Sequence, residues 1–229
     1  MKVRSLTLVG LLICLPLVAS AQAPVQNGNR LYAQQKYELA IKEYERVAEG
    51  DSEYATAIYN IGVCKYELWQ TNNAIELYKR AIKLRRGNYP KASFALAIAL
   101  EEQNKTAEAK EAYWQSVRTA SDEYPWAKFK LGLLEANDGN LELAVRLFTE
   151  AASTSGPHTA SSHNNLGVML ARMGRLPEAE KEFATALRQA GGQFNEASHN
   201  LSLCRSLQAT AQLRFEVDQL ALATPKFFR

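Results

Sequence analysis

The sequence predicts an all-α protein in which about five helix-turn-helix repeats stack side by side and a C-terminal helix caps the array. Tiny residues return at intervals of 34, 35, 35, 35 and 35 residues, at Gly28, Gly62, Ala97, Gly132, Gly167 and Ser202. An alanine follows twelve residues after each of the first five, at Ala40, Ala74, Ala109, Ala144 and Ala179. An aromatic residue follows four residues later, at Tyr44, Tyr78, Tyr113, Phe148 and Phe183. Agreement in several registers at one period is the signature of a repeat architecture.

Each repeat is expected to contain two helices separated by a short polar turn. The turns are expected at residues 34–37, 69–72, 104–107, 139–140 and 174–175. Glycine and asparagine in these turns can take a positive φ. Pro90 and Pro125 are expected to open first helices, where the missing N–H costs nothing. Helices joined by so few residues pack antiparallel.

The glycines inside first helices need a packing reason, because glycine in a helix costs roughly 1 kcal/mol relative to alanine. Gly167 and Ala179 together would let the two backbones of one repeat approach closely. Phe183, one turn after Ala179, would fill the space beside them.

These recurring positions resemble the tetratricopeptide repeat (TPR) family, and the segments GNLELAVRLFTEAA and GRLPEAEKEFATAL are similar to its second helix. The resemblance implies a right-handed α-solenoid over residues 22–188, with repeats near 21–54, 55–88, 90–123, 125–158 and 160–193. The family's tryptophan and proline are missing at its fourth and thirty-second positions. Lys65 and Glu135 occupy the usually apolar eleventh position, where local packing is therefore expected to differ.

The C-terminal part starts as another first helix but lacks the second-helix pattern. Residues 195–222 are therefore expected to form a capping helix with a polar outer face, bent or broken near Ala209. Residues 223–229 form a short tail, whose two phenylalanines either fold back or await a partner.

The N-terminal 21 residues have the three parts of a secretory signal peptide. A basic start with Lys2 and Arg4 precedes an apolar stretch, and Ala19-Ser20-Ala21 is a small-x-small cleavage site. We therefore expect cleavage after Ala21 and a periplasmic or secreted mature protein. No later stretch approaches the 18 or so apolar residues of a membrane helix, so no membrane span is expected after cleavage. A bacterial origin is favoured, although glycosylation sequons at Asn104 and Asn200 leave a eukaryotic secretory origin open.

Charge and cysteine content narrow the functional classes. Loss of the signal peptide leaves 25 basic and 24 acidic residues, interspersed rather than clustered, so no nucleic-acid partner is expected. Cys64 and Cys204 lie four repeats apart, and repeats contact only their neighbours, so the two thiols are expected to stay unpaired and buried.

No constellation of residues suggests catalysis. His158, His163 and His199 show no i, i+4 pairing of a helical metal site, and no glycine-rich phosphate loop or Gly-x-Ser-x-Gly motif occurs. Catalytic residues, a metal site and a cofactor are therefore all expected to be absent, and the protein is not expected to be an enzyme.

The resemblance also implies a concave groove lined by the first helices, where TPR proteins bind peptides. The positions that carry over are Asn29, Tyr59, Asn60, Tyr66, Lys91, Phe94, Trp126, Phe129, Lys130, Asn165 and Arg172. Aromatic area and amide or cationic neighbours suit an extended peptide. The alternative is that these rings pack between adjacent helices and meet no ligand.

Some TPR proteins grip a partner's C-terminal carboxylates with a dicarboxylate clamp. Asn29, Asn60 and Lys91 match three of its five positions, whereas Val25 and Ala95 replace its other two cations. Most of the charge that attracts a carboxylate is therefore missing.

The favoured function is a non-enzymatic scaffold of the bacterial envelope that holds an extended peptide or a helix of a partner protein in its groove. The alternative is a structural or oligomerising subunit that uses the convex face or the C-terminal tail. A homo-oligomer is one form that such a subunit could take.

Overall fold

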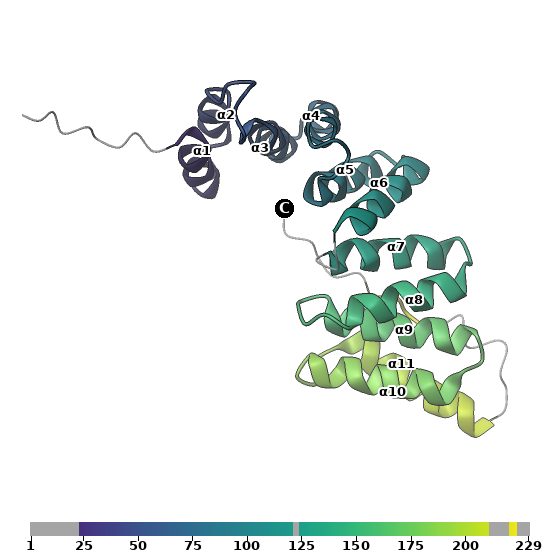
Figure 1. Cartoon of the computed structure of the whole chain (residues 1–229). Helices are drawn as coiled ribbons and strands as arrows, with labels where there is room; N and C mark the ends of the chain where they lie inside the picture. The colour runs from purple at the N-terminus through teal and green to yellow at the C-terminus, as the bar shows by residue number, and fades with distance from the viewer. Residues whose placement is uncertain (1–22, 121–123, 211–219, 224–229) are drawn as a thin grey trace, which may run out of the picture.

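The structure is a computed structural model that describes residues 23–120, 124–210 and 220–223, and within these residues it contains helices and no strands. The helices are α1 (Pro24–Ala33), α2 (Tyr37–Tyr44), α3 (Tyr54–Glu67), α4 (Thr71–Leu84), α5 (Pro90–Glu102), α6 (Thr106–Thr119), α7 (Pro125–Asn137), α8 (Leu141–Ala152), α9 (Thr159–Arg172), α10 (Leu176–Gln189) and α11 (Asn195–Thr210). They follow one another along a curved array (Figure 1). The all-α repeat solenoid is confirmed.

Consecutive helices pair into five modules, α1/α2 to α9/α10, and α11 packs on the last of them. The first helices begin at residues 24, 54, 90, 125 and 159, against expected starts near 21, 55, 90, 125 and 160. Each module contacts mainly the modules before and after it, as in a quasi-one-dimensional array.

The turn inside each module is closed by the same pair of backbone hydrogen bonds. In module 5 the Arg175 N–H donates to the Leu170 carbonyl at 2.8 Å, and the Gly174 N–H donates to the Ala171 carbonyl at 2.9 Å. This is the Schellman ending of a helix, which needs one residue with a positive φ. Glycine and asparagine supply that residue in modules 3 to 5, as predicted, at Asn104, Gly139 and Gly174.

Modules 1 and 2 use residues that the sequence did not single out. Gln35 and Trp69 take φ values of 58° and 61°, respectively. The repeated turn therefore imposes a left-handed residue even where the side chain disfavours it.

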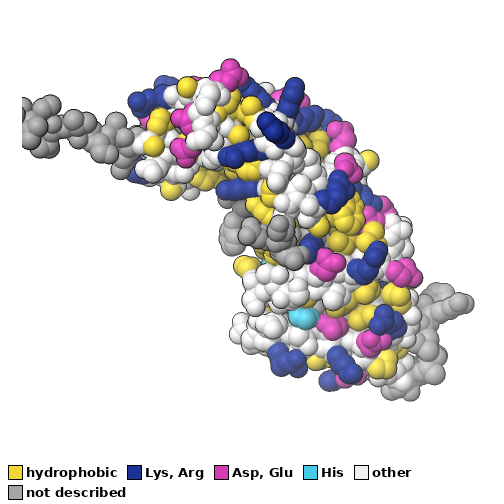
Figure 2. Space-filling model, viewed as in Figure 1, with side chains coloured by type: hydrophobic (Ala, Val, Ile, Leu, Met, Phe, Trp, Pro, Cys, Tyr) yellow, Lys and Arg dark blue, Asp and Glu magenta, His cyan; other side chains and the backbone are white. Residues whose placement is uncertain are grey.

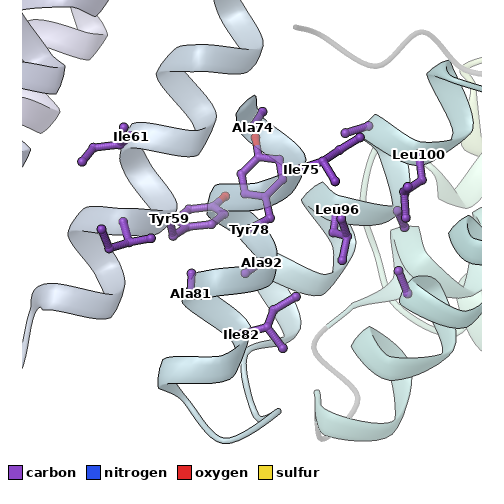
Figure 3. Close-up of a cluster of buried hydrophobic side chains, with 14 of the residues drawn as sticks. Tyr59, Ile61, Ala74, Ile75, Tyr78, Ala81, Ile82, Ala92, Leu96 and Leu100 are labelled. Carbon is purple, nitrogen blue, oxygen red and sulfur yellow. The ribbon is translucent and has the colours of Figure 1, made fainter. Parts of the chain in front are cut away.

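In modules 1, 2, 4 and 5 the glycine of the first helix lies under the edge of the module's aromatic ring. A Cβ built on Gly62 would lie 2.8 Å from Cε1 of Tyr78, and one built on Gly167 would lie 2.7 Å from Cε1 of Phe183. The ring therefore lies directly on the glycine, rather than beside a contact between two backbones. Figure 3 shows Tyr78 in its surroundings, close to Tyr59 and among aliphatic side chains of neighbouring helices.

The buried apolar residues form two clusters that meet in module 4, at α7 and α8. Ala127 and Leu131 belong to the cluster shared with modules 1 to 3, whereas Phe129 and Ala136 belong to the cluster shared with module 5 and α11. Helix α8 is also shared, since Leu147 belongs to the first cluster and Phe148 to the second, so module 4 joins the two halves of the core.

Glu135 occupies an apolar repeat position without leaving a lone buried charge. It is 3% exposed, and its carboxylate accepts hydrogen bonds from Lys110 Nζ at 2.7 Å and Asn140 Nδ2 at 2.6 Å. Lys110 also contacts Asp138 at 2.8 Å. The charged residue at this position is therefore paired between modules 3 and 4, which the sequence pattern did not predict.

The range 195–222 expected for the capping helix is wrong at its end, because the described residues 220–222 are not helical. In the described residues, helix α11 spans Asn195–Thr210, and Leu220–Ala223 lie in a non-helical conformation against α9 and α11. The reason is that asparagine side chains, rather than helical carbonyls and N–H groups, satisfy the backbone of this segment.

Two further predictions concern buried thiols and membrane spans. Cys64 and Cys204 are both buried and unpaired, as expected. None of the helices in the described ranges is long and apolar enough to span a bilayer. The predicted signal peptide lies outside the described residues.

Candidate functional site

The residues predicted to line a groove come from the odd-numbered helices. In the N-terminal half, α1, α3 and α5 lie on the inner side of the curve, and α2, α4 and α6 lie on its outer side (Figure 1). Helices α1, α3 and α5 supply Asn29, Tyr59, Asn60, Tyr66, Lys91 and Phe94. Helices α7 and α9 supply Trp126, Phe129, Lys130, Asn165 and Arg172.

The N-terminal end of this surface is polar. Asn29 Oδ1 accepts hydrogen bonds from the Tyr44 hydroxyl at 2.8 Å and from Asn60 Nδ2 at 3.1 Å. The Lys91 ammonium lies 5.1 Å from the centre of the Tyr59 ring. These residues line a hollow of about 440 Å³. The structure therefore brings together the three residues that match the dicarboxylate clamp.

The two unmatched clamp positions lack a cation in the structure as well. Val25 is buried in the core, and Ala95 lines the adjoining cavity. A carboxylate in this hollow would meet the single ammonium of Lys91.

Next to this hollow lies an apolar cavity of about 330 Å³, between α3 and α5. Its lining includes Tyr59, Tyr66, Phe94, Ile98 and Tyr124, with Glu67 and Lys91 as the charged members. This size falls within the range of ligand pockets, roughly 300–1,000 Å³. A mainly apolar lining with a few polar groups is typical of such pockets.

Tyr124 is a cavity residue that the sequence analysis missed. Its ring lies 6.0 Å from that of Phe94, and the ring of Tyr89 lies 5.5 Å from that of Tyr59. Both tyrosines directly precede the proline that opens the next first helix, 35 residues apart. The repeated Tyr-Pro pair was therefore the signal that could have identified this position.

Tyr32 on this surface and the buried Tyr113 behind it are neutral hydrogen-bond donors. Burial, followed by the nearby Glu67 carboxylate, raises the pKa of Tyr32, whose hydroxyl donates to Glu67 at 3.2 Å. Burial and Glu101 likewise raise the pKa of Tyr113, which donates to Glu101 at 2.6 Å. These phenols keep their protons at physiological pH.

Lys130, in the middle of the surface, forms an ion pair. Its ammonium lies 3.0 Å from one Glu101 oxygen and 3.2 Å from the other. It therefore brings little net positive charge to a ligand.

Trp126 and Phe129 differ in how much of their rings a ligand could contact. Phe129 is fully buried, and its ring lies 5.7 Å from that of Phe148, so the packing alternative describes it. Trp126 is half-buried, with its ring 6.0 Å from Phe129 and 5.1 Å from His158.

Burial lowers the pKa of His158, although backbone carbonyls, including that of Ala151 at 2.9 Å, act in the opposite direction.

At the C-terminal end, three fully buried asparagines hold residues 220–223 of the same chain. Ala221 N–H donates to Asn200 Oδ1 at 2.9 Å, and Asn164 and Asn200 donate to the Ala221 carbonyl at 3.0 and 2.9 Å. Ala223 N–H donates to Asn165 Oδ1 at 2.6 Å, and Asn165 Nδ2 donates to the Ala223 carbonyl at 2.9 Å.

This arrangement was not predicted, although Asn165 was named as a groove residue. Asn60, Asn165 and Asn200 occupy the same repeat position, at multiples of 35 residues. That recurrence marked the position, but only the fold shows that residues 220–223 return to it. Arg172, the last predicted groove residue, is half-buried at the end of α9.

Charged groups are dispersed over the surface. Figure 2 shows Lys and Arg side chains interspersed with Asp and Glu on the visible face. Among the described residues, no three His, Cys, Asp or Glu side chains are grouped so that they could hold a metal ion.

Comparisons with known proteins agree with the architecture. Residues 66–125, 94–157 and 129–194 match a family model described as tetratricopeptide repeat, and residues 28–68 match one described as TPR repeat. A comparison with curated proteins gives no match.

Solved structures show the same fold. YrrB, described as a TPR protein with an unusual peptide-binding site, aligns with a TM-score of 0.61 and 23% identity over 79% of this chain and 91% of that one. MamA from Desulfovibrio magneticus RS-1 aligns with a TM-score of 0.59 and 20% identity over 74% of this chain and 94% of that one. Because the family models together cover more than half of the sequence, the chain belongs to the tetratricopeptide repeat family.

Proposed function

We propose that this protein is a non-enzymatic scaffold of the bacterial envelope that binds an extended peptide or a helix of a partner protein on its concave face. TPR proteins generally act in protein-protein interactions, and this coarser role follows from family membership. The use of the groove as the binding site and the location of the protein in the envelope are proposed in addition to this role.

The observation that carries the proposal is the apolar cavity between α3 and α5. Phe94, a half-buried ring of its lining, lies 5.7 Å from the ring of Tyr113 and 6.0 Å from that of Tyr124. Rings held by neighbouring rings lose little conformational freedom on binding, which favours a hot spot for an apolar side chain. The adjoining Asn29, Asn60 and Lys91 offer amide groups and one cation to a peptide backbone.

The position of the polar hollow beside the apolar cavity favours an elongated ligand over a compact one. Tyr59, Val63 and Lys91 line both spaces, so the two are continuous across α3 and α5. An extended peptide could place an apolar side chain in the cavity while its backbone meets the amides.

The proposal is tested by selecting peptides from a random display library on the mature chain. We expect the selected peptides to share an aromatic or large aliphatic residue. They should bind the double variant Tyr66→Ala/Phe94→Ala at least tenfold more weakly, because truncating a hot-spot ring costs about 2 kcal/mol or more.

Trp69→Ala provides the matched control, because Trp69 is 74% exposed in the turn between α3 and α4 and does not line the cavity. This variant should bind the selected peptides as the parent does. Equal binding by the double variant, with an unchanged helical melt, would refute the cavity as the binding site. Protein recovered from an envelope fraction should begin at Gln22, and recovery from the cytoplasm with Met1 intact would refute the envelope context.

A further inference from the structure

At the C-terminal end of the array, opposite the apolar cavity, asparagine side chains bind residues 220–223 of the same chain. Asn164 and Asn165 on α9 and Asn200 on α11 are each 0% exposed. Their carboxamides are also bonded to one another: Asn200 Nδ2 donates to Asn164 Oδ1 at 2.9 Å, and Asn164 Nδ2 donates to Asn165 Oδ1 at 3.2 Å. We call these residues the three-asparagine site.

The asparagine side chains hydrogen-bond to the backbone of the occupant of the three-asparagine site. Both the N–H and the carbonyl of Ala221 and of Ala223 are hydrogen-bonded to asparagine side chains, at 2.6 to 3.0 Å. Every second residue is held, which matches the two-residue period of an extended chain. Any extended peptide has these groups, so the hydrogen bonds themselves impose no sequence.

Selectivity comes from two side chains of the segment. Leu220 is 4% exposed and belongs to the core cluster of α9 and α11, and Ala223 is 3% exposed. Ala221 and Leu222 are only half-buried. The site therefore requires an aliphatic residue and, three positions later, a small one. It encloses the two residues between them less tightly, although Leu222 still packs against the core cluster.

If residues 220–223 only closed the end of the array, they would not need buried asparagines to bind their backbone. Buried carboxamides are costly unless hydrogen-bonded, and an apolar last helix would close the array without them. Instead, Asn165 and Asn200 stand at the repeat position that Asn60 holds in module 2. There the Asn60 carboxamide bonds to Asn29 and lines a hollow of about 440 Å³. The same repeat position is thus occupied by a peptide at one end of the array and lines a hollow at the other.

We propose that the three-asparagine site is a peptide-binding site, that Leu220–Ala223 are its internal ligand, and that a partner segment of the pattern aliphatic-x-x-small binds there by displacing them. The segment runs from Asn200 on α11 towards Asn165 on α9, against the order of the modules. The proposal rests on the proposed scaffold function but uses a different site from the apolar cavity.

The test measures binding of a fluorescein-labelled peptide with the sequence of residues 217–226, VDQLALATPK, to the full mature chain by fluorescence polarisation. In the parent chain the internal segment competes at a high effective concentration. The variant Leu220→Asp/Ala223→Asp should release that segment and bind the labelled peptide at least tenfold more tightly. Adding Asn165→Ala and Asn200→Ala to the released variant should abolish binding.

The matched control places the same two charges on exposed positions, as Leu39→Asp/Leu84→Asp, which should bind like the parent. In the peptide, Ala221→Ser should be tolerated, whereas Leu220→Asp should eliminate binding. Circular dichroism melts establish that each variant folds, so that a loss of binding is not a loss of structure.

Three results would overturn the proposal. The released variant could melt as the parent does and yet fail to bind the peptide. The parent could bind as tightly as the released variant, which would mean that no internal competitor exists. The parent could form a concentration-dependent dimer that Asn165→Ala dissolves, which would assign the occupant to a second copy. None of these results affects peptide selection at the apolar cavity, so failure here is distinguishable from failure of the scaffold function.

Discussion

At the scale of single residues, the repeat depends on a contact between a ring and a glycine. Gly167 has no side chain because the edge of Phe183 occupies the place where a Cβ would be. Gly62 and Tyr78 repeat the contact in module 2, and Gly132 and Phe148 repeat it in module 4. Module 3 has Ala97 and Tyr113 at the corresponding positions and buries both in the same core cluster, so the repeat tolerates one methyl group there.

Gly167→Ala is therefore expected to lower the free energy of unfolding by about 1–2 kcal/mol, because the added methyl forces the Phe183 ring to move in a packed core. Chemical denaturation followed by circular dichroism measures the change. Gly50→Ala is the control, since nothing lies within 4 Å of a Cβ built there, and it should change stability by less than about 0.5 kcal/mol. Equal effects of the two substitutions would contradict the proposed role of the ring.

At the scale of helices, His158 ties three elements together at the start of α9. Its Nε2 bonds to the Ala151 carbonyl at the end of α8, and its ring packs on Trp126 of α7. It is 2% exposed, and burial is the main cause that lowers its pKa below the ordinary value. The folded protein therefore holds this imidazole neutral at a pH where an unfolded chain would protonate it.

The stability of this junction should depend on pH. Above the unfolded-state pKa of about 6.5, His158 is neutral in both states and costs nothing. As the pH falls below 6.5, His158 binds a proton in the unfolded chain but not in the folded one. The free energy of unfolding therefore decreases until the pH reaches the lower folded-state pKa.

Urea denaturation at pH 7.5, 6.5 and 5.5, with Trp fluorescence as the signal, measures this dependence. His158→Asn removes the titration and should flatten the part of the pH dependence that this residue causes. His163→Asn is the comparison, because it removes another histidine and leaves the junction intact. A parent and a His158→Asn variant that lose stability in parallel would show that the buried imidazole is not responsible.

At the scale of the whole molecule, an array of modules that contact mainly their neighbours can open at one end while the other end stays folded. Two buried thiols mark the two core clusters: Cys64 on α3 belongs to the first, and Cys204 on α11 belongs to the second. Burial raises the pKa of Cys64 to about 12 and also raises the pKa of Cys204. Both thiols should therefore react with alkylating reagents only after local opening.

Leu220→Asp should accelerate alkylation of Cys204 by roughly tenfold and leave Cys64 unchanged, because Leu220 shares only the second core cluster and local opening costs are set within that cluster. Time-resolved alkylation followed by peptide mass spectrometry separates the two thiols. Leu84→Asp, an exposed substitution on α4, should accelerate neither. Equal acceleration of both thiols by Leu220→Asp would show that the array opens as one unit.

Much of the architecture could be predicted because it depends on local, repeated contacts. The 35-residue spacing that places a glycine under a ring also specifies the helix pair and the turn between its helices. The turn residues Gln35 and Trp69 could not be predicted from residue type, because closure of the turn outweighs the local preference against a positive φ. The buried Glu135 could not be predicted either, since its partner Lys110 lies in the preceding module.

The candidate site, too, could be predicted from the sequence only in part. The sequence by itself determined which residues recur on the first helices, because a fixed period places equal positions on equal faces. The resemblance to the family then named Phe94, Lys91 and Asn165 as groove residues. Only the tertiary structure decided what those faces meet, since that depends on contacts between distant parts of the chain. Phe129 packs in the core, Tyr124 joins the cavity, and residues 220–223 return to the asparagines of α9 and α11.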